Sequence, residues 1–236
     1  MSETDNAMNE EKTAAPTLAQ SVSSNAVLLA LFALACTAVI AGTFLGTADR
    51  IADQKRAASL KALYQIVPQS SHDNDLLQDN SEFFASELGL RDAEKFYLAQ
   101  RKGRSVAIIY PTIARDGYSG DIEMLVGINS DSDTIAGVRV LSHRETPGLG
   151  DKIEIRKSDW ITGFEHRSLT APHTSGWAVS VDGGEFDSFT GATITPRAVV
   201  NAVHRVLQYH ESNEASIEHR IRVQTANLSQ PVTSSE

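Results

Sequence analysis

The sequence contains a single cysteine, Cys36. One thiol cannot form an internal disulfide, supply the thiolates of an iron–sulfur cluster or attach a haem through a CxxCH motif. Basic residues are also few, with 21 Lys and Arg against 30 Asp and Glu and a net charge of −9. Because nucleic-acid binding needs cations that neutralise phosphates, these numbers exclude a nucleic-acid partner.

Familiar catalytic motifs are missing as well. Residues 118–120 contain a serine next to a glycine but no G-x-S-x-G elbow. The glycines of 148–152 have the spacing of neither a dinucleotide fingerprint nor a P-loop, and His166 and His173 lack a partner at metal-ligand spacing. The sequence therefore predicts no catalytic residue, no metal site and no independent oxidation of NADH.

One long apolar run is present near the N-terminus. Residues 26–45 carry no charge, and as a helix about 20 residues match a hydrocarbon core of roughly 30 Å. A cleaved signal peptide would follow a basic segment, whereas residues 1–25 contain four acidic residues and one lysine. A buried core helix is rarely apolar on every face for this length. The run therefore predicts an uncleaved transmembrane helix over 26–46, after an acidic tail over 1–25.

The remainder of the chain has the pattern of one α+β domain. Residues 47–91 predict a helix followed by a polar linker, and a longer helix is predicted from Pro196 to about Tyr209. A short helix is predicted over 158–164. Strands are predicted over residues 95–102, 104–111, 121–129, 134–141 and 176–182.

These elements predict a domain over 92–211 with an antiparallel or mixed sheet and packing helices. The polar residues 212–236 predict a flexible C-terminal tail.

The segment with the most chemical content is DSFTGATITPR, residues 187–197. Thr195 is a good N-cap and Pro196 suits the first position of a helix. The N–H groups at such a helix start would face Thr193 and favour a phosphate there, with Arg197 as a possible countercharge. The two small residues before Thr193 leave room for a bulky group. A plain turn capped by threonines explains the same residues, so both interpretations stay open.

Thr190-Gly191-Ala192-Thr193 resembles the (S/T)GAT flavinylation motif of the FMN-binding domains in Rnf and Na⁺-translocating NADH:quinone reductase complexes. Two further segments, 116–127 and 143–152, are similar in order and spacing to the G-subunit family of Rnf complexes. The resemblance extends from about Asp116 to Val206. It implies FMN joined as a phosphoester to Thr193, with Asp187 and Thr190 recognised by a flavin transferase.

The same resemblance implies the surroundings of the flavin ring. Glu145, Thr146, Gly148 and Leu149 belong to a turn, ETPGLG, whose backbone N–H groups could serve the edge of the ring. Trp177 offers an aromatic face. A purely structural turn and a core tryptophan are the alternatives.

The family implies a single-pass subunit of the bacterial inner membrane with its main domain in the periplasm. It would relay electrons through FMN alongside the other Rnf-type subunits, in a complex that couples electron transfer between ferredoxin and NAD to ion transport. The basic residues just after the anchor favour a cytoplasmic domain instead, so the residues alone leave orientation open. A sensory FMN domain without electron relay and a membrane-tethered module without flavin remain alternative functions.

Overall fold

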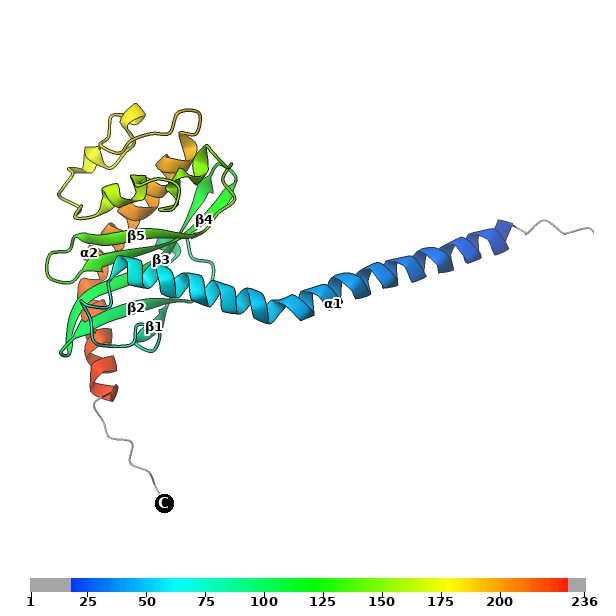
Figure 1. The fold of residues 1–236 in the computed structure, drawn as a ribbon, viewed down its shortest axis with the longest axis horizontal. Coiled ribbons are helices and arrows are strands. Elements are labelled where there is room, and N and C mark those ends of the chain that lie inside the picture. The colour runs from blue at the N-terminus through cyan, green and yellow to red at the C-terminus, as the bar shows by residue number, and fades with distance from the viewer. Residues whose placement is uncertain (1–17, 229–236) are drawn as a thin grey trace, which may run out of the picture. The chain divides into compact units, whose positions relative to one another are not determined.

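The computed structural model describes residues 18–228, and the chain divides into two compact units, Met1–Gln54 and Lys55–Glu236 (Figure 1). Helix α1 (Leu18–Ile66) belongs to the first unit up to Gln54. Its large apolar side chains between Val27 and Leu45 are 60 to 72 % exposed. Within the described residues, α1 is the one helix long and apolar enough to cross a membrane, and the predicted span lies inside it.

The second unit is built on an antiparallel sheet of five strands in the order β1-β2-β3-β4-β5, so each strand pairs with its neighbours in sequence (Figure 1). The predicted α+β class is confirmed, and the sheet is antiparallel throughout. The strands are β1 (Asn80–Phe83), β2 (Glu94–Arg101), β3 (Arg104–Gly117), β4 (Gly120–Asn129) and β5 (Ile135–Ser142).

Both faces of the sheet are covered, because alternate side chains of the central strands enter two different clusters. Ile108 and Tyr110 of β3 join the larger cluster, which packs against helix α2 (Ile194–Leu228). Ala107 and Ile109 of the same strand join a smaller cluster with the last turns of α1. This period of two is the burial pattern of a strand whose sheet is covered on both faces.

The last turns of α1 approach the sheet closely because two glycines face them. A Cβ at Gly127 would overlap Cγ2 of Ile66, and a Cβ at Gly137 would lie 3.4 Å from the Cα of Ile66. Leu63 is fully buried in the same cluster. The end of α1 is therefore part of the core of the second unit.

Helix α2 is longer than the sequence predicted. The predicted end near Tyr209 is wrong, since the helix continues to Leu228. Of the tail predicted over 212–236, residues 212–228 are helical, and 229–236 lie outside the described residues. Residues 210–228 contain no glycine or proline, so their polar composition does not interrupt the backbone hydrogen bonds. Ile217 is only 5 % exposed and belongs to the main core cluster.

The linker predicted before residue 92 also has more structure than expected. It contains β1 and the 3₁₀ helix η1 (Ser86–Leu88). Its polar residues serve as hydrogen-bonding groups for β2, because the amide of Asn74 donates to the Leu98 carbonyl at 2.8 Å and accepts from the Gln100 N–H at 2.8 Å. The polar composition that suggested a linker therefore fixes this segment to the sheet.

The strand predicted over 176–182 is wrong. The segment lies between two 3₁₀ helices, η4 (Thr174–Gly176) and η5 (Ser180–Asp182), and Val179 makes only an isolated bridge to Phe186. Trp177 and Val179 both point inward, which produced the alternating pattern without a neighbouring strand. The helix predicted over 158–164 is a 3₁₀ helix, η3 (Trp160–Phe164).

Candidate functional site

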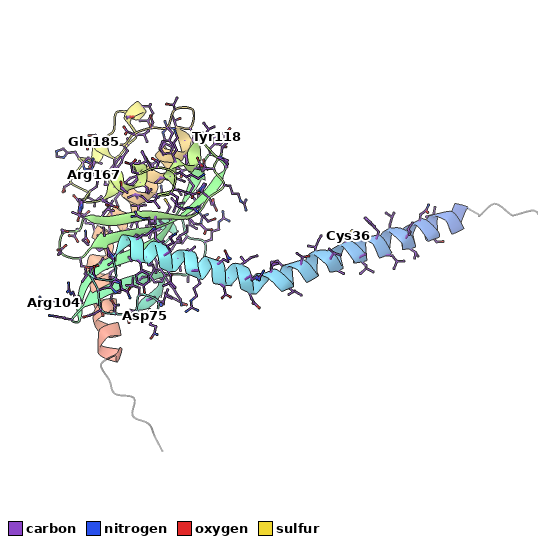
Figure 2. The ribbon with its side chains drawn as sticks, in the orientation of Figure 1. Cys36, Asp75, Arg104, Tyr118, Arg167 and Glu185 are labelled. Atoms are coloured by element: carbon purple, nitrogen blue, oxygen red, sulfur yellow. The ribbon has the colours of Figure 1, made fainter. Side chains whose placement is uncertain are left out.

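A cavity of about 580 Å³ opens where four segments meet. These are the β3–β4 turn, the turn after β5, the 189–192 turn and the start of α2, and Tyr118 marks this end of the hairpin in Figure 2. The lining residues are Tyr118, Glu145, Thr146, Leu149, Gly150, Gly191, Ala192, Thr193, Ile194 and Thr195. The structure therefore brings together the two motifs that the sequence singled out, although about 40 residues separate them in the chain.

The carboxylate of Glu145 connects three of these segments. One oxygen accepts the backbone N–H of Ser119 at 2.9 Å, and the other accepts the hydroxyl proton of Thr195. Glu145 is only 4 % exposed. A buried carboxylate is costly unless its oxygens are hydrogen bonded, and here both oxygens have donors. Glu145 thus fixes the hairpin turn and the start of α2 to the turn after β5.

Glycines make room for this carboxylate. A Cβ at Gly150 would lie 2.9 Å from Oε2 of Glu145 and 2.8 Å from Oγ1 of Thr195. A Cβ at Gly117 would lie 3.0 Å from Oε1 of Glu145. These distances are too short for a real side chain, so the two positions need glycine for close approach.

The motif itself forms a tight turn. The N–H of Ala192 donates to the Phe189 carbonyl at 3.0 Å, and Gly191 has φ +80°, a conformation that glycine adopts without strain. A Cβ at Gly191 would lie 3.8 Å from Cδ2 of Leu149, so the Leu149 side chain lies over this turn. The small residues of the motif thus keep the cavity open beside Leu149.

Three threonines lie close together in the motif, and their surroundings differ. Thr190 is exposed and does not line the cavity. Thr195 is fully buried and its hydroxyl is bonded to Glu145. Thr193 is half-buried, lines the cavity, and within residues 18–228 its hydroxyl makes no hydrogen bond. Thr193 is therefore the cavity-lining threonine of the three whose hydroxyl is not committed to a partner in the described residues.

The prediction that Thr195 caps α2 is corrected. The helix begins at Ile194, and the carbonyl of Thr193 accepts the Arg197 N–H at 3.4 Å, so Thr193 occupies the N-cap position. Pro196 consequently lies in the first turn but not at its first position. The sequence could not show that the Thr195 hydroxyl is taken by Glu145, 50 residues away.

Arg197 does not face the cavity as a free countercharge. Its guanidinium forms a two-point ion pair with Asp182, at 2.6 and 3.0 Å. The hydrogen bond from Arg197 holds the pKa of the exposed Asp182 carboxyl below its usual value. Another cation lies beside the motif, because the ammonium of Lys152 is 5.9 Å from the ring centre of Phe189, where the motif turn begins.

Most backbone N–H groups in the turn after β5 form hydrogen bonds within the turn itself. The N–H of Gly148 donates to Asp151 at 2.7 Å, and those of Leu149 and Gly150 donate to the Thr146 carbonyl at 3.1 Å. Three N–H groups that the sequence suggested as exposed donors are therefore already hydrogen bonded within the turn, as the structural alternative expects. Gly148 has φ +79° and open space around it, and it does not line the cavity.

Three large apolar side chains that line the cavity are exposed to solvent, which is uncommon for residues of this size and polarity. Tyr118 is 68 % exposed, and Leu149 and Ile194 are each 43 % exposed. Tyr118 and Ile194 were outside the predicted set of site residues. An aromatic residue in a two-residue turn between glycines, Gly117 and Gly120, was the available signal, because a turn seldom buries such a ring.

Besides Gly148 and Thr190, two more predicted site residues lie outside the cavity lining. Trp177 is 4 % exposed and stacks on His204, with ring centres 5.1 Å apart, so it belongs to the core and does not line the cavity. Asp187 is exposed, and its backbone carbonyl accepts the indole N–H of Trp160 at 2.8 Å. Asp187 and Thr190 lie on the outer surface of the motif, where an enzyme that recognises the motif could reach them.

Comparison with known families assigns matches to both units. Residues 117–208 match the family model of the FMN-binding domain, and residues 8–66 match that of the RnfG N-terminal region.

Relatives match over most of the chain. The G subunit of the ion-translocating oxidoreductase complex of Pseudoalteromonas atlantica is 45 % identical over 200 residues, which cover 84 % of this chain and 92 % of the relative. The protein of the same name from Shewanella oneidensis is 47 % identical over 198 residues, covering 82 % and 91 %. The crystal structure of Shewanella oneidensis NqrC is similar with a TM-score of 0.40 and 21 % identity, over 58 % of this chain and 65 % of that chain.

We predict that Glu145→Ala lowers the free energy of unfolding by about 1 to 3 kcal/mol, because it leaves the buried hydroxyl of Thr195 and the part-buried N–H of Ser119 without an acceptor. Glu145→Gln keeps one acceptor oxygen and should cost less. Urea unfolding of the full chain in detergent, followed by circular dichroism, measures both effects. A loss for Glu145→Ala no larger than that of the exposed control Glu123→Ala would contradict the bridging role.

Proposed function

The chain belongs to the family of G subunits of ion-translocating oxidoreductase complexes, and from this we propose that it carries FMN esterified to Thr193 and relays electrons within such a complex. In this role it is a redox subunit of a membrane-bound oxidoreductase. Oxidation of NADH would fall to other subunits, because the sequence contains no dinucleotide fingerprint.

One observation supports this proposal most strongly. Of the three clustered threonines, Thr193 alone combines a hydroxyl without a partner in the described chain with a position on the cavity wall. An ester needs a hydroxyl that is both reachable and uncommitted. Thr195 is neither, because it is fully buried and bonded to Glu145.

The residues around Thr193 fit FMN. A cavity of about 580 Å³ lies within the usual range for small-molecule sites. Thr193 stands at the N-terminus of the 35-residue helix α2, where unpaired N–H groups and the helix dipole stabilise a phosphate. Tyr118, Leu149 and Ile194 supply apolar surface for a flavin ring.

Attachment uses the hydroxyl of Thr193 as the incoming oxygen. The bond that forms joins Thr193 Oγ1 to the FMN phosphorus of a phosphoanhydride-activated flavin nucleotide, the donor on which a flavin transferase would act. The phosphoanhydride bond at that phosphorus breaks, and the hydroxyl proton leaves with the departing phosphate group. The exposed Asp187 and Thr190 are the residues we assign to recognition by that transferase.

The tethered flavin supplies chemistry that exchanges electrons one or two at a time. The chain holds the ring near the surface through an ester that cannot dissociate, so a deep enclosing pocket is not needed. Glu145 fixes the relative positions of Tyr118, Leu149 and Thr193, and thereby the surface against which the ring lies. The exposed rim leaves the ring open to neighbouring redox centres of the complex.

We predict that Thr193→Val folds normally and loses all covalent FMN, because the substitution keeps the side-chain shape and removes the ester oxygen. Intact mass of the chain coexpressed with a flavin transferase provides the measurement. Wild type should gain the mass of FMN less one water, and Thr193→Val should gain nothing.

The neighbouring threonines are the matched controls. Thr190→Ser should keep the flavin, since the family motif admits serine there. Thr195→Val should lose about 1 to 3 kcal/mol of stability, because a buried hydrogen bond to a carboxylate is removed, but should retain the flavin. The added mass persisting in Thr193→Val and vanishing in Thr195→Val would show that the assignment is wrong.

Replacing Leu149 or Tyr118 by alanine should change the absorption spectrum and midpoint potential of the flavin while its covalent attachment persists, because apolar surface beside the ring is lost. Val181→Ala is the control, since Val181 is 60 % exposed but does not line the cavity. Spectra and potentials of both cavity variants that match those of Val181→Ala would remove these side chains from the flavin site.

We further propose that residues 47–236 face the periplasm and 1–25 the cytoplasm, because flavin attachment in this family implies an extracytoplasmic domain. Protease added to intact spheroplasts should digest the large domain, whereas a cytoplasmic marker protein should survive. Complete protection of the domain, with digestion only after lysis, would reverse the orientation.

A further inference from the structure

A second groove lies within the folded unit, away from the residues of the flavin site. Its volume is about 530 Å³, and it lies between the last turns of α1, the end of β5 and residues 154–156. The lining residues are Ala58, Lys61, Ala62, Gln65, Arg139, Val140, Leu141, Ser142, His143, Glu154, Ile155 and Arg156. None of them lines the cavity at Thr193.

The charges in this groove oppose the charge of the whole chain. Three cations, Lys61, Arg139 and Arg156, and one carboxylate, Glu154, line the groove, although the chain has a net charge of −9. Arg156 pairs with Glu154 at 2.6 Å, and Arg139 pairs at 3.6 Å with Glu165, which lies outside the lining. Lys61 is exposed and forms no ion pair with any residue that the structure describes. The groove is therefore a local site of positive charge that favours an anionic occupant.

Arg139 is a structural part of the groove wall. Its guanidinium donates to the Val138 carbonyl at 2.7 Å and to the Gln65 carbonyl at 3.3 Å, so it fixes the end of α1 to β5. Its position beside the last carbonyls of α1 also suits the helix dipole. Because both terminal nitrogens of Arg139 already donate to backbone carbonyls, its guanidinium does not offer the two parallel N–H groups that would bind a free phosphate.

The remaining wall is apolar and shallow. Ala58 and Ala62 lie one turn apart on α1, opposite Val140, Leu141 and Ile155. Cations at the rim beside small apolar side chains match a peptide that carries both carboxylates and apolar groups. A free inorganic anion would make no use of the apolar wall.

The groove is connected to the flavin site by a short hydrogen-bonded chain. Arg156 contacts Glu154 at 2.6 Å, and Glu154 contacts Nε2 of His143 at 2.8 Å. Burial raises the pKa of Glu154, but the hydrogen bonds from His143 and Arg156 outweigh it and hold that pKa below its usual value. Nδ1 of His143 accepts the backbone N–H of Glu145 at 3.1 Å. The groove wall therefore ends one hydrogen bond from the residue that organises the flavin site.

We propose that this groove docks an acidic, partly apolar segment of a neighbouring protein chain. Carboxylates of that segment pair with Lys61 and Arg156, and its apolar side chains cover Ala58, Ala62 and Ile155. The proposal rests on the proposed function only in taking the neighbour to be another component of the complex. A segment docked in this groove would contact Arg156 and would therefore lie beside the hydrogen bonds that connect Arg156, Glu154 and His143 to Glu145.

Site-specific photo-crosslinking in the assembled complex tests the proposal. The photoreactive residue p-benzoylphenylalanine replaces Ala58 in the full chain, and the crosslinked peptide is identified by mass spectrometry from irradiated membranes. We expect a crosslink to an Asp- or Glu-rich segment of another protein of the complex. The same probe at Arg104 is the control, because Arg104 is exposed at the opposite end of β3 from Tyr118 (Figure 2).

Charge reversal tests the contacts themselves. Lys61→Glu combined with Arg156→Glu should abolish most of the crosslink from position 58, whereas Arg104→Glu should leave its yield unchanged. Circular dichroism of each variant establishes that the domain is folded, and Lys61→Gln with Arg156→Gln provides a milder pair that should reduce the yield in the same direction.

Three results would overturn the docking proposal: no crosslink from position 58, a crosslink only to lipid, or a yield that charge reversal leaves intact in folded protein. Intact mass is recorded on the same samples. Absence of the flavin mass would count against the proposed function, whereas absence of a crosslink from position 58 in the chain with Lys61 and Arg156 intact, with the flavin mass present, would count against the groove alone.

Discussion

The pair of hydrogen bonds to the buried carboxylate of Glu145 is the constraint on which the site depends. Ser119 and Thr195 lie 26 and 50 residues from Glu145 in sequence, yet both donate to it. A carboxylate that is 4 % exposed loses most of its hydration, so its two donors must stay in place. The hairpin turn, the turn after β5 and the start of α2 are consequently held in one arrangement, and the cavity is the space between them.

This arrangement also separates the roles of three similar side chains. Glu145 takes the hydroxyl of Thr195, and α2 begins two residues earlier than the sequence pattern indicates. Thr193 therefore stands at the helix start, with a hydroxyl that bonds to no residue the structure describes. Gly150 permits the close approach of Glu145 and Thr195, and Gly191 permits the turn that places Thr193 beside Leu149. Which threonine hydroxyl of the motif is left without a partner thus depends on Glu145, which lies far from the motif in sequence.

The sequence predicts the parts of this protein that depend on local pattern. The β pattern of residues 104–111 and 121–129, with turn-rich segments beside them, predicts β3 and β4, and the uncharged run before Leu45 predicts the anchor. Prediction fails where the deciding partner is remote. Trp177 carries no mark that distinguishes a ring stacked on His204 from one that contacts a cofactor, and the N–H groups of Gly148 and Leu149 look free until their acceptors are located.

The central claim is that FMN is esterified to Thr193 within the cavity that Glu145 organises. Crystallographic electron density of the chain coexpressed with a flavin transferase tests it most directly. The account predicts continuous density from Thr193 Oγ1 to a phosphate at the start of α2, with the ring beside Tyr118 and Leu149 and the carboxylate of Glu145 still bonded to Ser119 and Thr195. Density for the ester at Thr190 or Thr195, or a ring that lies outside this cavity, would contradict it.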